Sequence, residues 1–287
     1  MLLGLPALRG LRRRFPDAEI TLVAPLPQAR VACWEHLVDR VVSFDEPALA
    51  PLVAGTAREW PAVLSFPDLA VVWLRDHATV VATAERLRVA HAIGCAPLDA
   101  IAHRRHMAQW LGASVAPLGA RPEAAVLPTP SRAAPPRVVI HPGSGSARKN
   151  WSGWADLVRA LRPEHSTVVA GPADDRAAKT LLDQWPSGVS PPALLFRLSL
   201  EELGGVLANA SLYLGNDSGV THLAAAVGAP TVAVFGPTDP HIWEPVGPRV
   251  ITVGGTEVRA GIFAETPDWP TMDEVIHAAA EMTAQAE

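Results

Sequence analysis

The stretch LYLGNDSGVTHLAAAVGAPTVAVFGPTDPHIWEP, residues 212–245, carries the clearest structural pattern in the chain. An apolar run at 211–214 predicts a buried strand, and residues 216–219 have the composition of a tight turn and a helix cap. A helix is predicted at 220–227, where Gly-Ala-Pro ends it, and a second apolar strand follows at 231–235. The order strand, turn, helix, strand is typical of a parallel α/β unit.

The turn in this stretch has the chemistry of an anion site. A helix begins with about four backbone N–H groups that have no intrahelical partner, and the aligned peptide dipoles add roughly half a positive charge there. Gly219 lets an anion approach the backbone, while Ser218, Thr221 and His222 can add donors. This pattern indicates a phosphate-binding turn. The alternative is that Asp217 or Ser218 only caps a helix, and this segment alone leaves both interpretations open.

Composition limits the class of protein. A chain of 287 residues can form two domains, and its net charge of −5 gives no reason to expect a nucleic-acid partner. Two cysteines, Cys33 and Cys95, cannot form a disulfide framework and suit a reducing compartment. No apolar stretch reaches about 18 residues, and the first residues lack a signal-peptide pattern. We therefore expect a cytoplasmic protein.

Residues 1–116 alternate between helical and strand patterns, which predicts an N-terminal domain with a parallel sheet and right-handed crossovers. Helices are predicted at 2–15, 28–37, 77–88 and 101–111, and strands at 19–24, 40–44, 69–74 and 89–93. A doubly wound domain normally starts with a strand from the middle of its sheet. Since a helix comes first here, we expect an incomplete N-terminal domain that has lost residues ahead of Met1, the alternative being a domain without its central strand.

Two basic groups occur in this half. Arg9, Arg12, Arg13 and Arg14 lie on one side of the first predicted helix, where they can meet an anionic acceptor or a membrane surface, or form a solvated face. Residues 103–106, His-Arg-Arg-His, can line a cleft or coat a helix. Neither histidine has a Cys or carboxylate at ligand spacing, so no structural zinc is expected.

A proline-rich segment at 117–136 predicts the linker, after which a C-terminal domain spans 137–287. That domain opens with a strand at 137–141 and a Gly/Ser-rich loop that leads to Lys149. The order GxxxxGK[ST] of a Walker loop is absent. Paired with the turn at 216–219, however, this loop strengthens the expectation of a phosphate site.

The remaining units of the C-terminal half continue the alternation. Strands are predicted at 166–170 and 194–196. Helices are predicted from about 153 to 161, from the end of the segment 171–175 through 184, and at 271–284, and residues 199–202 are a capping signal for one more helix. A carboxylate at Asp174 or Asp175 can accept a hydrogen bond from a ribose hydroxyl, or can simply favour the start of a helix. His141 has no assigned chemistry.

Three stretches together resemble glycosyltransferase family 9, the heptosyltransferase-like enzymes of lipopolysaccharide inner-core synthesis. They are LPALRGLRRRFPDAEITLVAP at 5–25, HPGSGSARKNWSGW at 141–154, and LSLEELGGVLANASLYLGNDSGVTHLAAAVGAPTVAVFGPTDP at 198–240. The resemblance covers nearly the whole chain. It implies an α/β protein of GT-B architecture, in which two Rossmann-like domains face each other across a cleft, with the donor on the C-terminal domain and the acceptor on the N-terminal one.

The resemblance also implies roles for individual positions. Ser144 and Lys149 would contact the phosphates or sugar of the donor, Asp175, or Asp174 in its place, would hold the ribose, and the backbone near Leu198 would meet the adenine. The diphosphate would be held by Asp217, Ser218, Gly219 and His222. On the acceptor side we assign Arg9, Arg12 and Arg13.

The implied reaction is inverting transfer of a heptose, or a related sugar, from an ADP-sugar to a lipid-linked or polysaccharide acceptor of the lipopolysaccharide type. We expect no cofactor and no metal, and a cytoplasmic protein that contacts the inner face of the membrane peripherally. In the family a Gly-Asp turn ahead of the first helix supplies the general base, and this sequence starts after it. One alternative is therefore a catalytically silent nucleotide-sugar-binding homologue. A Rossmann oxidoreductase is disfavoured, because no GxGxxG follows a predicted strand.

Overall fold

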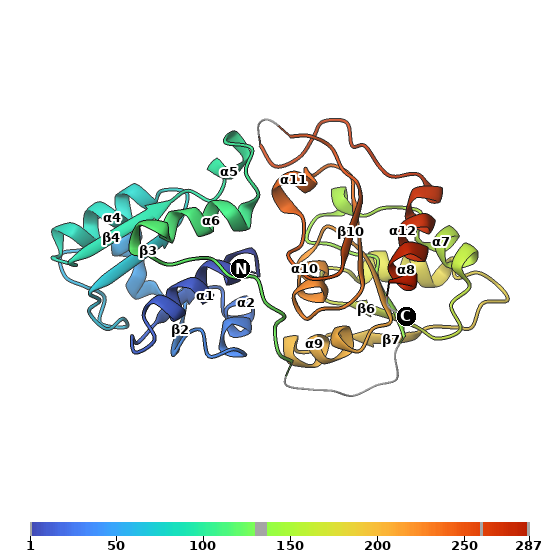
Figure 1. Cartoon of the computed structure of the whole chain (residues 1–287), viewed down its shortest axis with the longest axis horizontal. Helices are drawn as coiled ribbons and strands as arrows, with labels where there is room; N and C mark the ends of the chain where they lie inside the picture. The colour runs from blue at the N-terminus through green and yellow to red at the C-terminus, as the bar shows by residue number, and fades with distance from the viewer. Residues whose placement is uncertain (1, 130–136, 259–260, 286–287) are drawn as a thin grey trace. The chain divides into compact units, whose positions relative to one another are not determined.

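The computed structural model describes residues 2–129, 137–258 and 261–285. The chain divides into two compact units, unit 1 at Met1–Ala124 and unit 2 at Ala125–Glu287 (Figure 1). The division falls inside the segment 117–136, which the sequence predicts as a linker. Residues 130–136 of that segment lie outside the described residues, so the extent of the linker stays a prediction.

Unit 1 contains two separate pairs of parallel strands. The strands are β1 Thr21–Ala24, β2 Arg40–Ser43, β3 Leu69–Trp73 and β4 His91–Cys95. The helices are α1 Leu5–Arg14, α2 Leu26–Ala29, α3 Ala50–Val53, α4 His77–Arg86, α5 Asp99–Ala102 and α6 Met107–Val115, with 3₁₀ turns η1 Leu2–Gly4, η2 Arg30–Cys33, η3 Pro47–Leu49 and η4 Ala116–Leu118. β1 pairs only with β2, and β3 only with β4.

These pairs correct the prediction of one parallel sheet in the N-terminal half. Each pair has its own helical cover, because α2 contacts β1 and β2 while α4 contacts β3 and β4. Among the described residues of unit 1, no strand joins the two pairs. The alternating pattern of a strand shows that it is partly buried, but not which neighbour it pairs with.

The helix predicted at 101–111 is also wrong, because two helices occupy this region. α5 ends at Ala102, and Arg104 has a φ of 47°, a left-handed conformation in which a helix cannot continue. α6 then starts afresh at Met107, where the ring Nδ1 of His106 accepts a hydrogen bond from Ala108 N (3.3 Å). The apolar spacing of the two helices is continuous, so periodicity alone joins them.

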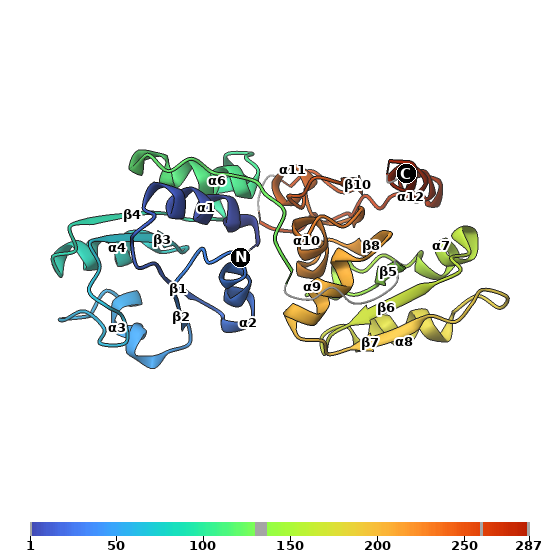
Figure 2. The same ribbon diagram turned by 60° about the horizontal axis from the view of Figure 1, so that its bottom comes forward.

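Unit 2 is built on a six-stranded parallel sheet in the order β10-β9-β8-β5-β6-β7. Figure 2 labels β10, β8, β5, β6 and β7 of this sheet. The strands are β5 Val138–His141, β6 Ser166–Ala170, β7 Ala193–Phe196, β8 Leu212–Asn216, β9 Thr231–Phe235 and β10 Val250–Gly254. The helices are α7 Trp154–Leu161, α8 Asp175–Asp183, α9 Leu200–Ala208, α10 Gly219–Ala226, α11 Pro240–Trp243 and α12 Met272–Ala284, with the 3₁₀ turn η5 Ala147–Lys149. β10 and α11 are not predicted from the sequence.

The strand order reverses direction between β5 and β8. From β5 the chain adds β6 and β7 on one side, and β8, β9 and β10 then follow on the other. In open parallel sheets, ligands bind outside the carboxyl ends of the strands at such a reversal. The ends of β5 and β8 are His141 and Asn216, so the fold itself places a candidate site at the loops that follow them.

The sheet of unit 2 is covered on both faces, which explains its continuous apolar strands. On one face, α7, α8 and α12 pack in a core that includes Trp154, Leu181 and Met282 (Figure 2). Alternate strand residues such as Leu214 and Val232 point into that core. α10 contacts β8 and β9 on the other face, next to α9.

The predicted cap of α9 is confirmed. The Ser199 hydroxyl accepts from Glu202 N (3.2 Å), and the Glu202 carboxylate accepts from Ser199 N (2.8 Å). These reciprocal bonds satisfy two backbone N–H groups at the helix start. No helix among the described residues is long and apolar enough to cross a membrane.

We expect Ser199→Ala to lower the free energy of unfolding of unit 2 by about 1 kcal/mol, because one N–H group of the first turn loses its partner. Urea denaturation followed by circular dichroism measures this change. Ser190→Ala, at an exposed residue outside the helices, is the matched control. Equal stability of the two variants would contradict the role given to the cap.

Candidate functional site

Three loops meet at the carboxyl edge of the sheet in unit 2. They follow β5, β8 and β9, which are neighbours in the order β9-β8-β5. The loop after β5 brings Lys149, the turn after β8 brings Asp217, and the loop after β9 brings Thr238. Parallel strands end at the same edge, so residues far apart in the sequence come together there.

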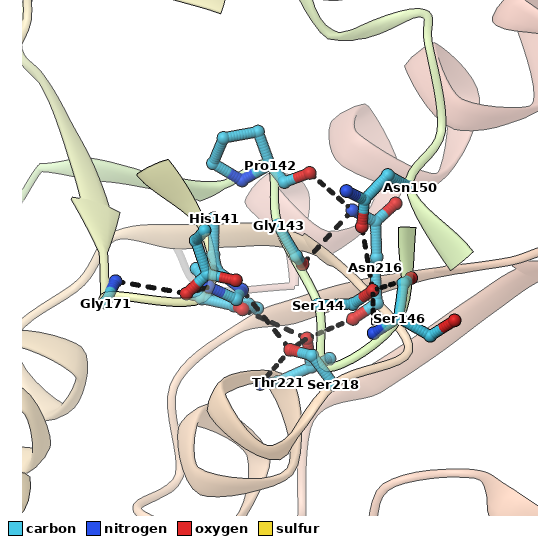
Figure 3. Close-up of polar contacts among 12 residues, drawn as sticks. His141, Pro142, Gly143, Ser144, Ser146, Asn150, Gly171, Asn216, Ser218 and Thr221 are labelled. Atoms are coloured by element: carbon cyan, nitrogen blue, oxygen red, sulfur yellow. Dashed lines mark hydrogen bonds and ion pairs between the residues drawn. The ribbon is translucent and has the colours of Figure 1, made fainter. Parts of the chain in front are cut away.

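The buried side chain of Asn216 ties the first two loops together (Figure 3). Its Nδ2 donates to the carbonyl oxygens of Pro142 (2.8 Å) and Gly143 (3.3 Å). Its Oδ1 accepts from Trp151 N (2.9 Å). Both ends of the loop after β5 are therefore fixed to the end of β8 by one amide group.

Asp217 is the centre of the polar cluster. Its Oδ2 lies 3.2 Å from Lys149 Nζ and accepts from the Thr238 hydroxyl (2.8 Å). Its Oδ1 lies 3.7 Å from His222 Nε2. The other ring nitrogen of His222, Nδ1, is buried and has no hydrogen-bond partner. The structure thus brings together the predicted residues Lys149, Asp217 and His222, and adds Thr238.

The surroundings keep the Asp217 carboxylate ionised. Burial raises the pKa of this group, but the hydrogen bond from His222 and the charge of Lys149 lower it more, with help from the charge of His222 and the Thr238 hydroxyl. The net result is a pKa below the ordinary value. The contacts of Asp217 hold Lys149 and His222 in place, and a buried, ionised carboxylate repels an anion. Direct contact of Asp217 with a diphosphate stays a prediction.

Ser218 caps α10 and is nearly fully buried. Its Oγ accepts from Thr221 N (3.3 Å) and lies 3.1 Å from the Thr221 hydroxyl. Gly219, the first residue of the helix, is exposed, and a Cβ there would meet no atom within 4 Å. The first turn is therefore open to an incoming group at Gly219, whereas the Ser218 side chain is turned inward.

Ser144 organises the Gly/Ser-rich loop. Its hydroxyl donates to the carbonyl oxygen of Ser146 (2.6 Å) and lies 2.7 Å from Asn150 Oδ1, as Figure 3 shows. It also accepts from Ser146 N (3.3 Å). These contacts hold the loop that leads to Lys149. Direct contact of Ser144 with a donor stays a prediction.

The two candidate ribose carboxylates lie in different environments. Asp174 is buried, and its Oδ2 contacts His141 Nε2 (3.1 Å) and accepts from Gly171 N (3.0 Å). Asp175 is exposed in the first turn of α8. Leu198 is half-buried in the loop after β7, at the same edge of the sheet. Of the two acids, Asp175 is the one whose carboxylate can reach a ligand without leaving a partner inside the protein.

Sequence reasoning did not assign three residues that the structure places at this edge: Asn216, Thr238 and His141. Each stands at or just after the carboxyl end of a strand, next to a turn that was identified. The position of a polar residue at a strand end was the available signal. What the sequence does not contain is the strand order, which determines which of these ends are neighbours.

The arginines predicted to bind an acceptor form ion pairs inside unit 1. They are Arg9 with Glu35 (2.6 Å), Arg12 with Asp39 (2.5 Å) and Arg13 with Glu123. Arg9 is buried, and its ion pair with Glu35 fixes α1 to the segment that carries Glu35. Acceptor binding by these residues stays a prediction, and the structure gives their side chains another role.

The histidines at 103 and 106 also have contacts within unit 1. The His103 ring stacks on Trp110 at 4.8 Å with an interplanar angle of 16°, and His106 caps α6. Among the described residues, no group of three or more His, Cys, Asp or Glu is placed to hold a metal ion.

The sequence profile of glycosyltransferase family 9 (heptosyltransferase) matches residues 113–266, which include all of the polar cluster. The chain belongs to glycosyltransferase family 9. The resemblance seen in its motifs is confirmed, and the matched region lies mostly in unit 2.

Curated relatives of this family 9 chain are lipopolysaccharide heptosyltransferases. Heptosyltransferase 3 of Escherichia coli is 30% identical over 135 residues, which is 45% of this chain and 38% of that protein. Heptosyltransferase 1 of Pseudomonas aeruginosa is 32% identical over 143 residues, 49% of this chain and 40% of that protein. The matches thus span well under half of the length of these relatives.

Solved structures extend the likeness in fold to nearly the whole chain. A family 9 glycosyltransferase from Veillonella parvula superposes with a TM-score of 0.74 at 17% identity, covering 99% of this chain and 94% of that one. An E. coli heptosyltransferase with ADP gives 0.67 at 21% identity, covering 98% and 95%. The family 9 chain is therefore an α/β protein of the GT-B fold class, as predicted.

The buried acids predict the response of unit 2 to acid. Burial raises the pKa of Asp174, but the hydrogen bond and charge of His141 and the N–H of Gly171 bring it below its ordinary value, as for Asp217. A carboxylate with a lowered folded-state pKa adds stability above its unfolded pKa of about 3.9, and that stability is lost as pH falls through the folded value.

We therefore expect the melting temperature of the wild type to fall steeply below about pH 4. Asp217→Asn should be less stable at neutral pH and should lose less on acidification, since one titrating carboxylate is gone. Differential scanning calorimetry across this range measures both effects. Asp175→Asn, at the exposed neighbour of Asp174, is the control. An acid slope in Asp217→Asn as steep as in the control would contradict the assignment.

Proposed function

We propose that this family 9 chain is an inverting glycosyltransferase that moves a heptose, or a related sugar, from an ADP-sugar to an acceptor of the lipopolysaccharide type. The observation that carries the proposal is the cluster of Lys149, Asp217 and His222 beside the open first turn of α10. The names of the relatives support the heptose and the acceptor. The E. coli structure with ADP supports the nucleotide.

The proposed work of the cluster follows from the charge that develops on the leaving group. When the bond between sugar and diphosphate breaks, negative charge grows on the phosphate oxygen while the sugar carbon becomes cationic. A positive side chain and a helix N-terminus that are already in place stabilise this charge more in the transition state than in the ground state. Lys149 supplies the first and the backbone at Gly219 the second.

The rest of the donor is assigned along the same edge of the sheet. Asp175 would accept from the ribose hydroxyls, and the backbone at Leu198 would meet the adenine. Ser144 would act by holding the loop that carries Lys149, given its contacts with Ser146 and Asn150. The general base and the acceptor site are not assigned.

A second candidate is a nucleotide-sugar-binding homologue that carries out no transfer. One observation favours it: the family match covers residues 113–266, on the donor side, so donor binding has more support than transfer. Release of ADP from ADP-heptose, measured with and without a heptose-deficient lipopolysaccharide acceptor, separates the two. Acceptor-dependent release supports the enzyme, while binding of ADP-heptose without release supports the silent homologue.

We expect Lys149→Ala to weaken ADP binding by about ten- to a hundredfold, because a charge-assisted contact with the diphosphate is lost. Isothermal titration calorimetry with ADP and ADP-heptose measures the change. The chain contains one other lysine, Lys179, exposed on α8, so Lys179→Ala is a matched control. We expect wild-type affinity from that control.

Thermal-shift measurements with ADP, UDP, GDP and NAD test the nucleotide. Ligand at about 100 times its dissociation constant stabilises a protein by roughly 2.7 kcal/mol, which moves the midpoint by several degrees. Selective stabilisation by ADP is expected. Stabilisation by NAD alone, or equal affinity of the two lysine variants for ADP, would overturn the proposal.

A further inference from the structure

A continuous chain of hydrogen-bonding side chains runs beneath the first turn of α10. It starts at Asp174 Oδ2, which lies 3.1 Å from His141 Nε2, and continues from His141 Nδ1 to Ser218 Oγ at 3.3 Å. Ser218 Oγ lies 3.1 Å from Thr221 Oγ1, which in turn lies 3.0 Å from the Tyr213 hydroxyl. All five residues are buried. Figure 3 shows His141 linked to Ser218 by a dashed line.

The directions of the hydroxyl protons at the far end of this chain can be counted. The Thr221 hydroxyl donates its single proton to the carbonyl oxygen of Asn216. It must therefore accept from the Tyr213 hydroxyl. Burial raises the pKa of Tyr213, so this phenol keeps its proton and can donate it. The second lone pair of Thr221 Oγ1 remains for Ser218.

His141 joins this chain through both of its ring nitrogens. Nε2 faces the Asp174 carboxylate, and Nδ1 faces the Ser218 hydroxyl. Ser218 Oγ also accepts from Thr221 N, the first-turn N–H group that it caps. Removal of the imidazole would therefore take one buried partner from Asp174 and one from Ser218.

We propose that His141 is a positioning residue of the donor site, an imidazole that links Asp174 to the cap serine of α10 and so fixes the first turn for a diphosphate. This inference rests on the proposed function for the identity of the ligand. His141 acts through Ser218. The Ser218 side chain stays inward because His141, Thr221 N and the Thr221 hydroxyl all contact its Oγ, and the exposed start of the helix at Gly219 is left for the ligand.

The surroundings of His141 support this link. Asp174 is its carboxylate partner, and the pKa of that acid lies below its ordinary value. Asp217, the residue before Ser218 in the sequence, is paired with Lys149. A Cβ at Gly143 would lie 2.3 Å from Asp174 Oδ1, so the loop after β5 leaves this carboxylate room to reach the ring.

The test asks whether His141 acts through Ser218. We expect His141→Phe to weaken binding of ADP and of inorganic pyrophosphate by about tenfold, because Ser218 loses a buried partner that holds it inward, while adenosine binds as before. Ser218→Ala should have a similar effect, and the double variant should be little worse than either single one. Additive losses, or equal losses for adenosine, would show a general structural role and overturn the proposal.

Two controls keep the outcomes separate. Met282→Ala removes a buried side chain from the core on the other face of the sheet, so it destabilises unit 2 and should leave pyrophosphate affinity unchanged. Pyrophosphate also separates this inference from the proposed function. If the wild type binds pyrophosphate and not ADP, the proposed nucleotide is wrong, while the comparison of His141→Phe with Ser218→Ala still decides the role of His141.

Discussion

The side-chain amide of Asn216 joins two loops that are about 70 residues apart in the sequence. The geometry of the candidate site at the carboxyl edge of the sheet in unit 2 depends on this contact. It donates to the carbonyl oxygens of Pro142 and Gly143 and accepts from Trp151 N, so buried backbone groups at both ends of the loop after β5 are satisfied. A buried backbone group that loses its partner costs about 1–3 kcal/mol. Because the amide holds the loop against the end of β8, Lys149 arrives at a fixed distance from Asp217.

Two buried acids face this edge, and each has a basic partner: Lys149 beside Asp217, and His141 beside Asp174. Such pairs seldom add much net stability, since the cost of removing both charges from water offsets most of their attraction. What they do is hold the side chains of Lys149 and His141 in place. Under the proposed function, an arriving diphosphate would exchange one partner of Lys149 for another, and the protein would not have to assemble the site when the ligand binds.

The sequence was sufficient for most helices and strands of unit 2, with the exceptions of β10 and α11, but not for which strands lie next to one another. Turn and cap residues predicted α9 and α10, because Ser199 and Ser218 bond to backbone atoms a few residues away, and such contacts are local. The separation of unit 1 into two strand pairs was not predicted, because the apolar pattern of a strand does not show which strand it pairs with. The break at Arg104 was not predicted, because apolar periodicity continues through it. Thr238 was not assigned, because its contact with Asp217 joins the ends of two strands whose order the sequence does not state.

The turn at 216–219 is a helix cap in the folded protein, and this does not exclude the proposed phosphate site. A cap uses the serine side chain, which accepts from the backbone of the first turn, whereas an anion would use the N–H groups that remain at the exposed helix start. The inward position of the Ser218 hydroxyl is what separates the two roles. A serine that turned outward to give its proton to phosphate would have to leave Thr221 N, so the stability of the helix start and the affinity for an anion would compete. With the hydroxyl held by buried partners, the proposed function would let one turn serve both purposes.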